Sequence, residues 1–348
     1  MKPVLVGLGA LGVRVARQLL ATGEQERLLV LSRDPSTAQR RAAGLGRPGA
    51  ITVEQLPPAR PGGSESRRRI KLRALFDGAD VVVLACPGPL RVAAETALEC
   101  GAHVVSTCDD PEVAVDLMDL SDRAASAGRS VVLGAAMAPG LSCLLAAWGA
   151  WHLEAAQEVH VATLGTGGPA CARRRHTALR EPVDEWRDGR WARKVASSGR
   201  ELVWFPVHGG ADCYRVDRPD GRLLVPALPG VHWVTGRAAA SRRDRMTSWL
   251  PMLRPPHPEG TVGAVRVEIR GHQGGLPRSI VLGAAGRPAV LGGTVAATAA
   301  QRAAAGLLLS GAGGLASLCP DPGDVLGELV ERGLRLFSFT GDQPSAAW

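Results

Sequence analysis

The chain has few aromatic residues and almost no lysine, yet neither shortage makes it disordered. Among 348 residues there are one Tyr, four Phe and eight Trp, and the lysines are Lys2, Lys71 and Lys194. Disordered chains combine low hydrophobicity with high net charge, whereas 45% of these residues are hydrophobic and the mean hydropathy is near zero. We therefore expect a folded chain that is long enough for two domains.

The formal net charge is +8, but it is weak evidence for a nucleic-acid partner. Arginine in place of lysine, with abundant alanine and glycine, also follows from a GC-rich coding sequence. The densest basic run, residues 67–73, has no aromatic residue between its cations on which bases could stack. We predict a solvated helix face there, no nucleic-acid partner, and a protein that meets small anionic molecules.

Several motifs of other enzyme classes are missing. The seven cysteines show no CxxC pair, which predicts a reducing cytoplasm, no disulfide framework and no metal site of the zinc-ribbon kind. HExxH and GxxxxGK[ST] are absent, which excludes zincin and P-loop chemistry. The one tyrosine, Tyr214, is followed four residues later by Arg218, so the Tyr-x-x-x-Lys pair of short-chain dehydrogenases is missing.

Two apolar stretches resemble membrane or export segments only superficially. The first twelve residues lack a small-x-small cleavage site. Residues 131–153 have no acid, Lys or Arg, but Pro139-Gly140 interrupts them and residues 131–133 are typical of a strand. We predict no membrane partner.

A glycine-rich segment near the start gives the strongest positive signal. An apolar run at residues 3–7 leads into GLGALG at residues 7–12, after which apolar residues recur at helical spacing. This GxGxxG follows a strand and opens a helix, the context in which it indicates dinucleotide binding. The three glycines permit a tight turn, close approach to a pyrophosphate and close helix packing, and the helix start offers free N–H groups to phosphate. The cofactor-binding residues predicted here are Gly7, Gly9, Ala10, Leu11 and Gly12.

The end of the second predicted strand, residues 28–31, indicates which dinucleotide binds. An NAD site usually carries an acid there for the ribose hydroxyls, but Ser32 and Arg33 occupy the place. A hydroxyl and a guanidinium suit a 2′-phosphate, so we predict NADP rather than NAD. In the alternative, Asp34 binds the ribose and Arg33 is solvated.

Strands and helices then alternate, which predicts a Rossmann-type, doubly wound parallel sheet. Further strands are predicted at residues 51–53, 80–85, 103–106 and 130–133, and helices at 90–100 and 112–127.

Within this pattern the sequence resembles the saccharopine dehydrogenase (saccharopine reductase-like) family. The likeness lies in three segments: DVVVLACPGP at 80–89, ALECGAHVVSTCDD at 97–110 and GAAMAPGLS at 134–142. The family includes amino-acid, polyamine and lipid branches, and the Ala-Pro-Gly-Leu-Ser form is closer to the amino-acid and polyamine branch.

The resemblance implies that the chain leaves its first domain, builds a substrate domain and returns. We expect a dinucleotide-binding domain at residues 1–140, with a C-terminal return at about 292–348, and an α+β substrate and dimerisation domain at 141–291. Predicted strands at 158–164, 202–207, 222–225 and 264–270 give the latter a largely antiparallel sheet. An Ala-rich helix at 294–310 is expected to pack back on the first domain. The resemblance to the family also implies a homodimer.

Reacting groups are expected at the carboxyl ends of the parallel strands. By resemblance, Ala85, Cys86, Pro87 and Thr107 flank the dinucleotide, while Pro139 and Gly140 close over the nicotinamide. Cys108 and Asp109 are the polar groups expected nearest the cofactor and are the first catalytic candidates. Cys108 is alternatively an ordinary buried thiol.

The second domain offers a basic segment after a glycine-rich turn at residues 165–168. Arg173 and Arg174 are predicted to bind a substrate carboxylate, and His176 to supply a proton, unless the segment is simply a solvated loop. His208, at a strand end, is a second substrate-binding candidate, and His103 is expected to be structural. Tryptophans in this half belong either to the core or to an apolar pocket wall: Trp186, Trp191, Trp204, Trp233 and Trp249.

Together these features predict a cytoplasmic, NADP-dependent oxidoreductase of this family that acts on a small molecule. The predicted reaction is hydride transfer to or from an imine or amine (CH–NH) of an amino-acid-like substrate. The alternatives are a reductase of a C=C or carbonyl group in a secondary-metabolite or lipid precursor, and a non-catalytic NADP-binding sensor. A third alternative is a redox-neutral enzyme that uses its bound cofactor transiently to move an alkyl group between amines.

Overall fold

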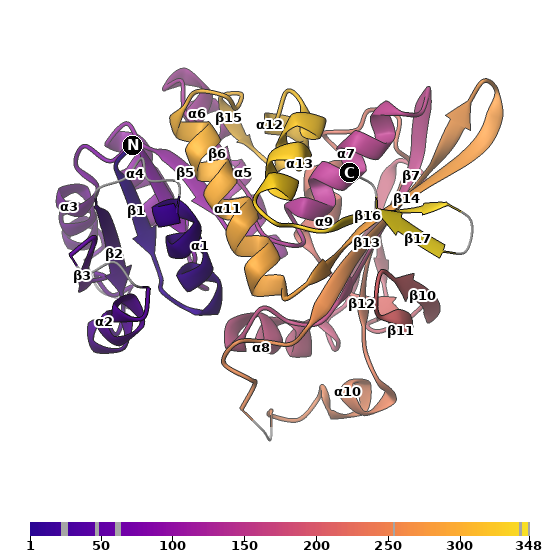
Figure 1. The fold of residues 1–348 in the computed structure, drawn as a ribbon, viewed down its shortest axis with the longest axis horizontal. Helices are drawn as coiled ribbons and strands as arrows, with labels where there is room; N and C mark the ends of the chain where they lie inside the picture. Colours follow the sequence, from indigo (N-terminus) through magenta and orange to yellow (C-terminus); the bar gives the residue numbers. More distant parts are fainter. Residues whose placement is uncertain (22–26, 46–48, 60–63, 253–254, 341–342, 347–348) are drawn as a thin grey trace.

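The computed structural model describes residues 1–348 except 22–26, 46–48, 60–63, 253–254, 341–342 and 347–348. Its two β-sheets lie side by side, and the long helix α11 (Pro288–Ala304) lies between them (Figure 1). This arrangement confirms the predicted fold class, a Rossmann-type parallel sheet followed by an α+β domain.

The first sheet is parallel, with the order β15-β6-β5-β4-β1-β2-β3. The strands are β1 (Pro3–Val6), β2 (Leu28–Ser32), β3 (Ile51–Gln55), β4 (Val81–Leu84), β5 (His103–Ser106), β6 (Ser130–Val132) and β15 (Gly311–Gly313). The helices are α1 (Ala10–Ala21), α2 (Pro35–Ala43), α3 (Glu65–Phe76), α4 (Arg91–Glu99), α5 (Pro111–Met118), α6 (Ser121–Ser126), α12 (Leu315–Leu318) and α13 (Pro322–Glu331).

The strand order fixes where a ligand can bind. Strands β1, β4 and β5 are buried at every position, as expected where helices cover both faces of a parallel sheet. The order runs outward from β1 to β2 and β3 on one side and from β4 to β6 on the other. Such a reversal leaves a crevice at the carboxyl ends of the two central strands, β1 and β4.

The second sheet follows the path β10-β11-β12-β7-β13-β14-β16-β17, with β8 paired to β12 and β9 paired to β8. All its pairs are antiparallel except β12 with β7. The strands are β7 (Ala155–Leu164), β8 (Val183–Arg187), β9 (Arg190–Lys194), β10 (Glu201–Phe205), β11 (Gly209–Arg215), β12 (Trp233–Ala239), β13 (Gly263–Gln273), β14 (Leu276–Gly286), β16 (Leu336–Thr340) and β17 (Gln343–Ala346). The helices are α7 (Leu141–Trp151), α8 (Pro169–Ala178), α9 (Pro219–Leu224) and α10 (Arg242–Thr247).

One predicted strand is wrong. Residues 222–225 were expected to be extended, but they belong to the end of helix α9 and its cap. Pro219 is in the first turn of this helix, where its fixed φ is favourable, and Leu223 and Leu224 turn toward the core. A short apolar run such as Leu223-Leu224-Val225 cannot by itself distinguish a strand from a helix turn.

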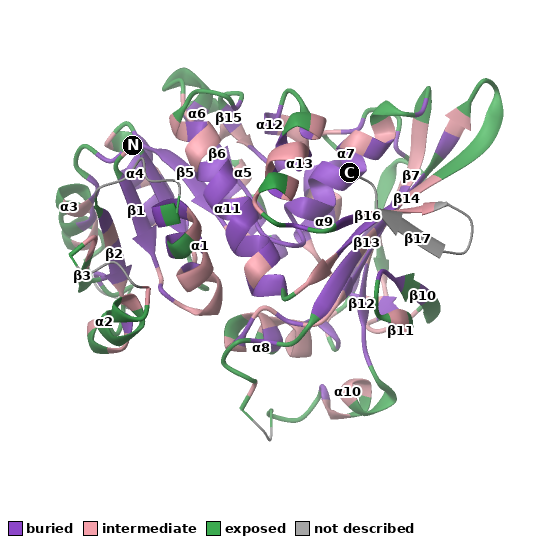
Figure 2. Ribbon diagram, viewed as in Figure 1, coloured by how far each residue is buried: buried purple, intermediate pink, exposed green. Residues whose placement is uncertain are grey.

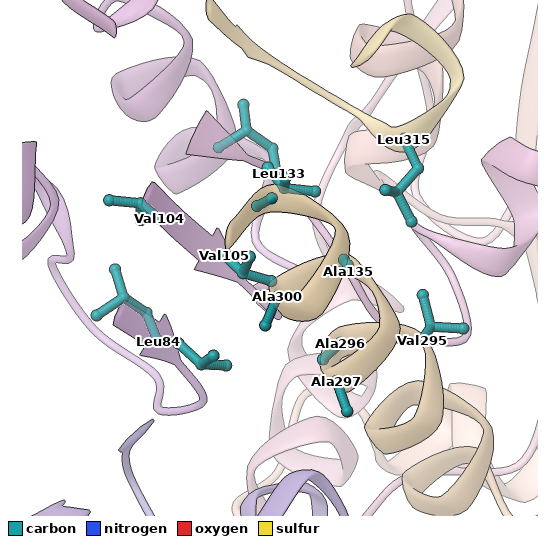
Figure 3. Close-up of a cluster of buried hydrophobic side chains, with 14 of the residues drawn as sticks. Leu84, Val104, Val105, Leu133, Ala135, Val295, Ala296, Ala297, Ala300 and Leu315 are labelled. Atoms are coloured by element: carbon teal, nitrogen blue, oxygen red, sulfur yellow. The ribbon is translucent and has the colours of Figure 1, made fainter. Parts of the chain in front are cut away.

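The Ala-rich helix α11 packs back on the first domain, as predicted. It approaches helix α1 closely, because a Cβ on Gly293 would lie 2.4 Å from the Cβ of Arg14. Most of α11 is buried (Figure 2), and its alanines meet the apolar side chains of β4 and β5 in one core (Figure 3). In the described part of the chain, no helix is long and apolar enough to cross a bilayer.

The C-terminal segment serves both sheets. Strand β15 extends the parallel sheet, whereas β16 and β17 extend the second sheet through β14. The C-terminal segment was expected to return to the first domain only, but its last two strands belong to the second sheet. The boundary at residue 140 stays a prediction.

The basic run on helix α3 is partly paired with acidic side chains. Arg69 forms ion pairs with Glu65, Glu95 and Glu99, and Arg73 pairs with Glu99. The exposure of Arg67, Lys71 and Arg73 supports the predicted solvated helix face.

Candidate active site

A cavity of about 500 Å³ opens at the carboxyl ends of β1, β2, β4 and β5. Residues of the second domain, from α8 and from the link between β11 and α9, close its other side. The cavity therefore lies where the strand order predicts a ligand, and both domains contribute to it.

The glycine-rich loop forms one wall and has the predicted geometry. Gly7 has φ +99°, and a Cβ there would lie 2.6 Å from the carbonyl oxygen of Ala85. A Cβ on Gly12 would lie 2.1 Å from the carbonyl oxygen of Gly7, so helix α1 needs glycine to approach the strand. Around Gly9, in contrast, no described atom lies within 4 Å of such a Cβ. The open space at Gly9 fits a pyrophosphate that approaches the backbone.

Two helix starts meet at this wall. Ala10 and Leu11 begin α1 and line the cavity, and Gly168, the residue before α8, would place a Cβ 2.7 Å from that of Ala10. The first turns of both helices contain no acidic residue. The turn at residues 165–168 therefore lies at the same wall as the glycine-rich loop, and two helix starts there give a geometry that favours an anion.

At the end of β2, internal bonds occupy Ser32 and Asp34. The Asp34 carboxylate accepts a hydrogen bond from the backbone N–H of Thr37 at 3.0 Å and caps helix α2. That bond is the main reason why the pKa of Asp34 falls to about 2. The Ser32 hydroxyl accepts a bond from the backbone N–H of Asp34 at 3.1 Å.

Two guanidinium groups remain at this end of the cavity. The Arg33 guanidinium lines it and has no hydrogen-bond or ion-pair partner among the described residues. Arg41, which the sequence analysis missed, lies two helical turns along α2 and donates to the carbonyl oxygen of Leu8 at 2.7 Å. The available signal was the spacing between Asp34 and Arg41, which places both on one helix. Helix α2, however, had not been predicted.

The other predicted cofactor residues divide into two groups. Ala85, Cys86, Pro87 and Thr107 line the cavity. Pro139 and Gly140 do not, and the three residues before them, 136–138, line it instead. The turn folds back on itself: the peptide bond before Pro139 is cis, and a Cβ on Gly140 would meet the carbonyl oxygen of Ala136 at 2.4 Å.

Cys108 and Asp109 both line the cavity, as predicted. Burial raises the pKa of the Cys108 thiol to about 12, so it stays protonated at neutral pH and is a poor nucleophile. Burial also raises the pKa of Asp109, against the opposing effect of the Arg218 and Arg174 guanidinium groups. The neighbouring Cys171 thiol, another cavity residue, faces the Asp109 carboxyl group.

Neither predicted histidine reaches the cavity. His176 is on the side of α8 that faces away, and its Nε2 lies 2.9 Å from the carbonyl oxygen of Leu250. His208 is exposed in the turn between β10 and β11. His103 has the expected structural role, because its Nδ1 accepts the backbone N–H of Ser130 at 3.1 Å. The five tryptophans of residues 186–249 do not line the cavity either, and Trp204 and Trp249 are exposed.

Arg173 and Arg174 both line the cavity but differ in their partners. Arg174 pairs with Glu181 at 2.6 Å, and its Nε lies 3.8 Å from Asp110. The guanidinium of Arg173 has no partner among the described residues. Arg173 is therefore the member of the basic run that is free to bind an anion.

Arg218 is a structural clamp that the sequence analysis did not identify as a site residue. Its guanidinium pairs with buried Asp220 at 3.0 Å and donates to Thr163 Oγ1 at 3.2 Å and to the carbonyl oxygen of Ala138. Asp220 in turn accepts the Ser142 hydroxyl at 2.5 Å. These contacts tie the turn before α7 to the second sheet and fix the segment that carries Asp217.

Asp217 is the second missed group, and its carboxyl group faces the cavity without a hydrogen-bond or ion-pair partner among the described residues. Burial raises its pKa to about 6. A polar pair directly after a strand was the available signal, the same one that identified Asp109. It was missed because strand β11 had not been predicted.

Groups of three or more His, Cys, Asp or Glu side chains that could hold a metal do not occur in the described ranges.

Comparisons with known proteins support the fold. No family model matches the chain, and no curated protein matches it. Apo saccharopine dehydrogenase (L-Glu forming) from Saccharomyces cerevisiae superposes with a TM-score of 0.67 over 97% of this chain and 100% of that one, at 14% identity. C. glutamicum DAP dehydrogenase in complex with DAP gives 0.47 at 16% identity, covering 96% and 99% of the two chains. An engineered D-amino acid dehydrogenase bound to NADP+ gives 0.46 at 14% identity, with the same coverage. At this identity the first superposition confirms, for the fold, the resemblance to the saccharopine dehydrogenase family.

Proposed function

We propose that the protein is an NADP-dependent oxidoreductase that transfers hydride to or from a CH–NH group of an amino-acid-like small molecule. The observation that carries the proposal is the single cavity, which runs from the open backbone at Gly9 to the acidic and basic side chains of the second domain. A phosphate-binding loop and a polar substrate end in one cavity are what a dinucleotide-dependent enzyme requires.

The preference for NADP rests on which groups are free at the end of β2. Asp34, the acid that could bind a ribose diol, caps α2, while Arg33 has no partner among the described residues and Arg41 also lines this end of the cavity. Guanidinium groups pair well with the oxygens of a 2′-phosphate. When bound, the nicotinamide supplies or accepts the hydride.

The choice of a nitrogen-containing substrate rests on the charged side chains at the end of the cavity opposite the glycine-rich loop. Arg173 offers a carboxylate a guanidinium that no described residue pairs with, and Asp109 and Asp217 offer carboxyl groups for a nitrogen. A reductase of C=C or carbonyl groups in a lipid precursor would have an apolar end without converging charges. The presence of a group able to carry a proton, Asp217, also speaks for catalysis rather than for a non-catalytic sensor.

We extend the proposal to a homodimer in the cytoplasm. All seven cysteines are free thiols, which suits a reducing compartment. Light scattering on the purified protein tests the dimer: a mass of twice 36.3 kDa supports it, and a mass of one chain contradicts it.

The activity is tested by following NADPH absorbance with two panels of compounds. One contains 2-oxo acids with ammonia or an amino acid, and the other contains ketones and enones without nitrogen. We expect NADPH oxidation with a member of the first panel. Oxidation with the second panel alone would favour the C=C or carbonyl reductase, and NADPH binding without turnover would favour the sensor.

A further inference from the structure

Several acidic side chains gather around Arg174 at the substrate end of the cavity. Arg174 is surrounded by Asp109, Asp110, Glu181 and Asp217, and its close ion pair is with Glu181. Of the acidic side chains that line this end, Asp217 forms no ion pair with any described residue. A positively charged ligand group would supply the partner that its carboxylate lacks.

The carboxyl groups of Asp109 and Asp217 differ in the side chains that contact them. The Arg218 and Arg174 guanidinium groups attract the Asp109 carboxyl group, and the Cys171 thiol faces it. Asp217 has no hydrogen-bond or ion-pair partner among the described residues, since its neighbour Arg218 binds Asp220, Thr163 and Ala138 instead.

The charged groups around Asp217 come from three elements. Arg222 on α9 and Arg174 on α8 attract it, and Asp184 on β8 and Glu181 after α8 repel it. Both arginines already have acidic partners, since Arg222 pairs with Asp184 at 3.0 Å and Arg174 with Glu181 at 2.6 Å. The Asp217 carboxyl group is thus free to bind a ligand while the segment beneath it is held by the Arg218 clamp.

We propose that Asp217 is the catalytic residue that binds the substrate nitrogen and exchanges its proton. The inference rests on the proposed function, for which it names the acid–base group. In amine oxidation the Asp217 carboxylate takes one proton from the substrate ammonium: an N–H bond breaks, a carboxyl O–H bond forms, and a neutral amine with a free electron pair remains. In the reverse direction the protonated carboxyl group returns that proton to the product amine.

The ionisation of Asp217 suits this role. Its pKa of about 6, raised mainly by burial, lies near neutrality, where a group can both accept and donate protons efficiently. An ammonium beside it favours the carboxylate, so binding of an amine should release a proton to the solvent at pH 6.

The test uses calorimetry on the protein saturated with NADP+, at pH 6 and in two buffers of different ionisation enthalpy. The probes are L-glutamate, L-lysine and L-alanine, each compared with its 2-hydroxy analogue, which lacks the α-nitrogen. We expect an amino acid to bind with proton release. In Asp217→Asn both the proton release and roughly tenfold of the affinity should be lost, as for a charged hydrogen bond, while binding of the hydroxy analogue changes little.

A matched variant distinguishes proton exchange from a general effect of charge. Asp184→Asn removes a carboxylate that raises the pKa of Asp217 but leaves the Asp217 carboxyl group in place. Proton release should then persist with its midpoint at lower pH. Once an active substrate is found, the pH profile of kcat in the oxidation direction should lose its acidic limb in Asp217→Asn only.

Three results would overturn the inference: equal affinity and proton release in wild type and Asp217→Asn, tighter binding of the hydroxy analogues than of the amino acids, or no binding of any probe. Each leaves the proposed cofactor intact as long as NADP+ itself binds. Failure of NADP+ to bind would instead contradict the proposed function.

Discussion

At the scale of single residues, the cofactor preference depends on what Asp34 does. It lies just beyond the place where an acid usually binds the ribose of NAD, and its carboxylate caps helix α2 through Thr37. Asparagine also caps helices well. We therefore expect Asp34→Asn to change the Kd for NADPH by less than about twofold, because no ligand contact is removed. Fluorescence titration checks this, and a large loss of NADH and NADPH affinity together would show that Asp34 binds the ribose.

The site residues that could be predicted are those with a local signal. Gly7, Gly9 and Gly12 follow from chain geometry at a strand-to-helix turn, and Asp109 from its place after a buried strand. Asp217 and Arg41 required knowledge of strand β11 and helix α2, which carry weak periodicity. His176 was misplaced because the direction of a side chain depends on helix phase: its neighbours Arg173 and Arg174 face the cavity and it faces away.

At the scale of elements, the contact between α1 and α11 depends on glycine. A Cβ on Gly293 would lie 2.4 Å from that of Arg14, so a side chain there must push the two helices apart. We expect Gly293→Val to lower the free energy of unfolding by about 1–3 kcal/mol, as overpacking does. Gly327→Ala is the control: it lies within α13, a Cβ there meets no described atom within 4 Å, and alanine should stabilise by about 0.5–1 kcal/mol.

Urea unfolding of both variants measures these changes. Equal stability of Gly293→Val and wild type would mean that the helices do not pack as described.

The sequence predicted this contact correctly because an Ala-rich helix of low polarity must bury most of its surface. It could not predict α9, because the short apolar run at its end, Leu223-Leu224-Val225, fits a strand equally well.

At the scale of the whole molecule, Asp217 links stability to pH. Its pKa is about 6 in the folded protein and about 3.8 when unfolded. The folded state therefore holds the proton more tightly, and stability is lost as pH rises from about 4 to 6. The two-unit difference corresponds to at most about 3 kcal/mol, at 1.36 kcal/mol per unit.

Asp217→Asn should thus be more stable than wild type at pH 8, by up to about 2–3 kcal/mol, and similar to it at pH 4. Thermal unfolding at both pH values measures the difference. Asp188→Asn, an exposed change in the nearby turn between β8 and β9, should show no such dependence. The same pH dependence in wild type and Asp217→Asn would exclude Asp217 as its source.

The fold as a whole was predictable because its first half repeats a strong pattern of apolar strands and helices, and the resemblance supplied the second domain. The pairing within the second sheet was not, since its central strand β7 pairs with β12 and β13, which come much later in the sequence, and since β8, β9, β11, β12 and β14 had not been predicted. Nor could the sequence show that β16 and β17 leave the first domain for the second sheet.

The central claim is that the cavity binds NADP through the glycine loop and the arginines beyond β2. Fluorescence titration of the protein with NADPH and NADH tests it most directly, with Arg33→Asp as the variant and Arg17→Asp, exposed on α1 and outside the cavity, as the charge-matched control. We predict tighter binding of NADPH than of NADH, and a loss of about tenfold or more in NADPH affinity for Arg33→Asp alone. Failure of the wild-type protein to bind either nucleotide would contradict the account.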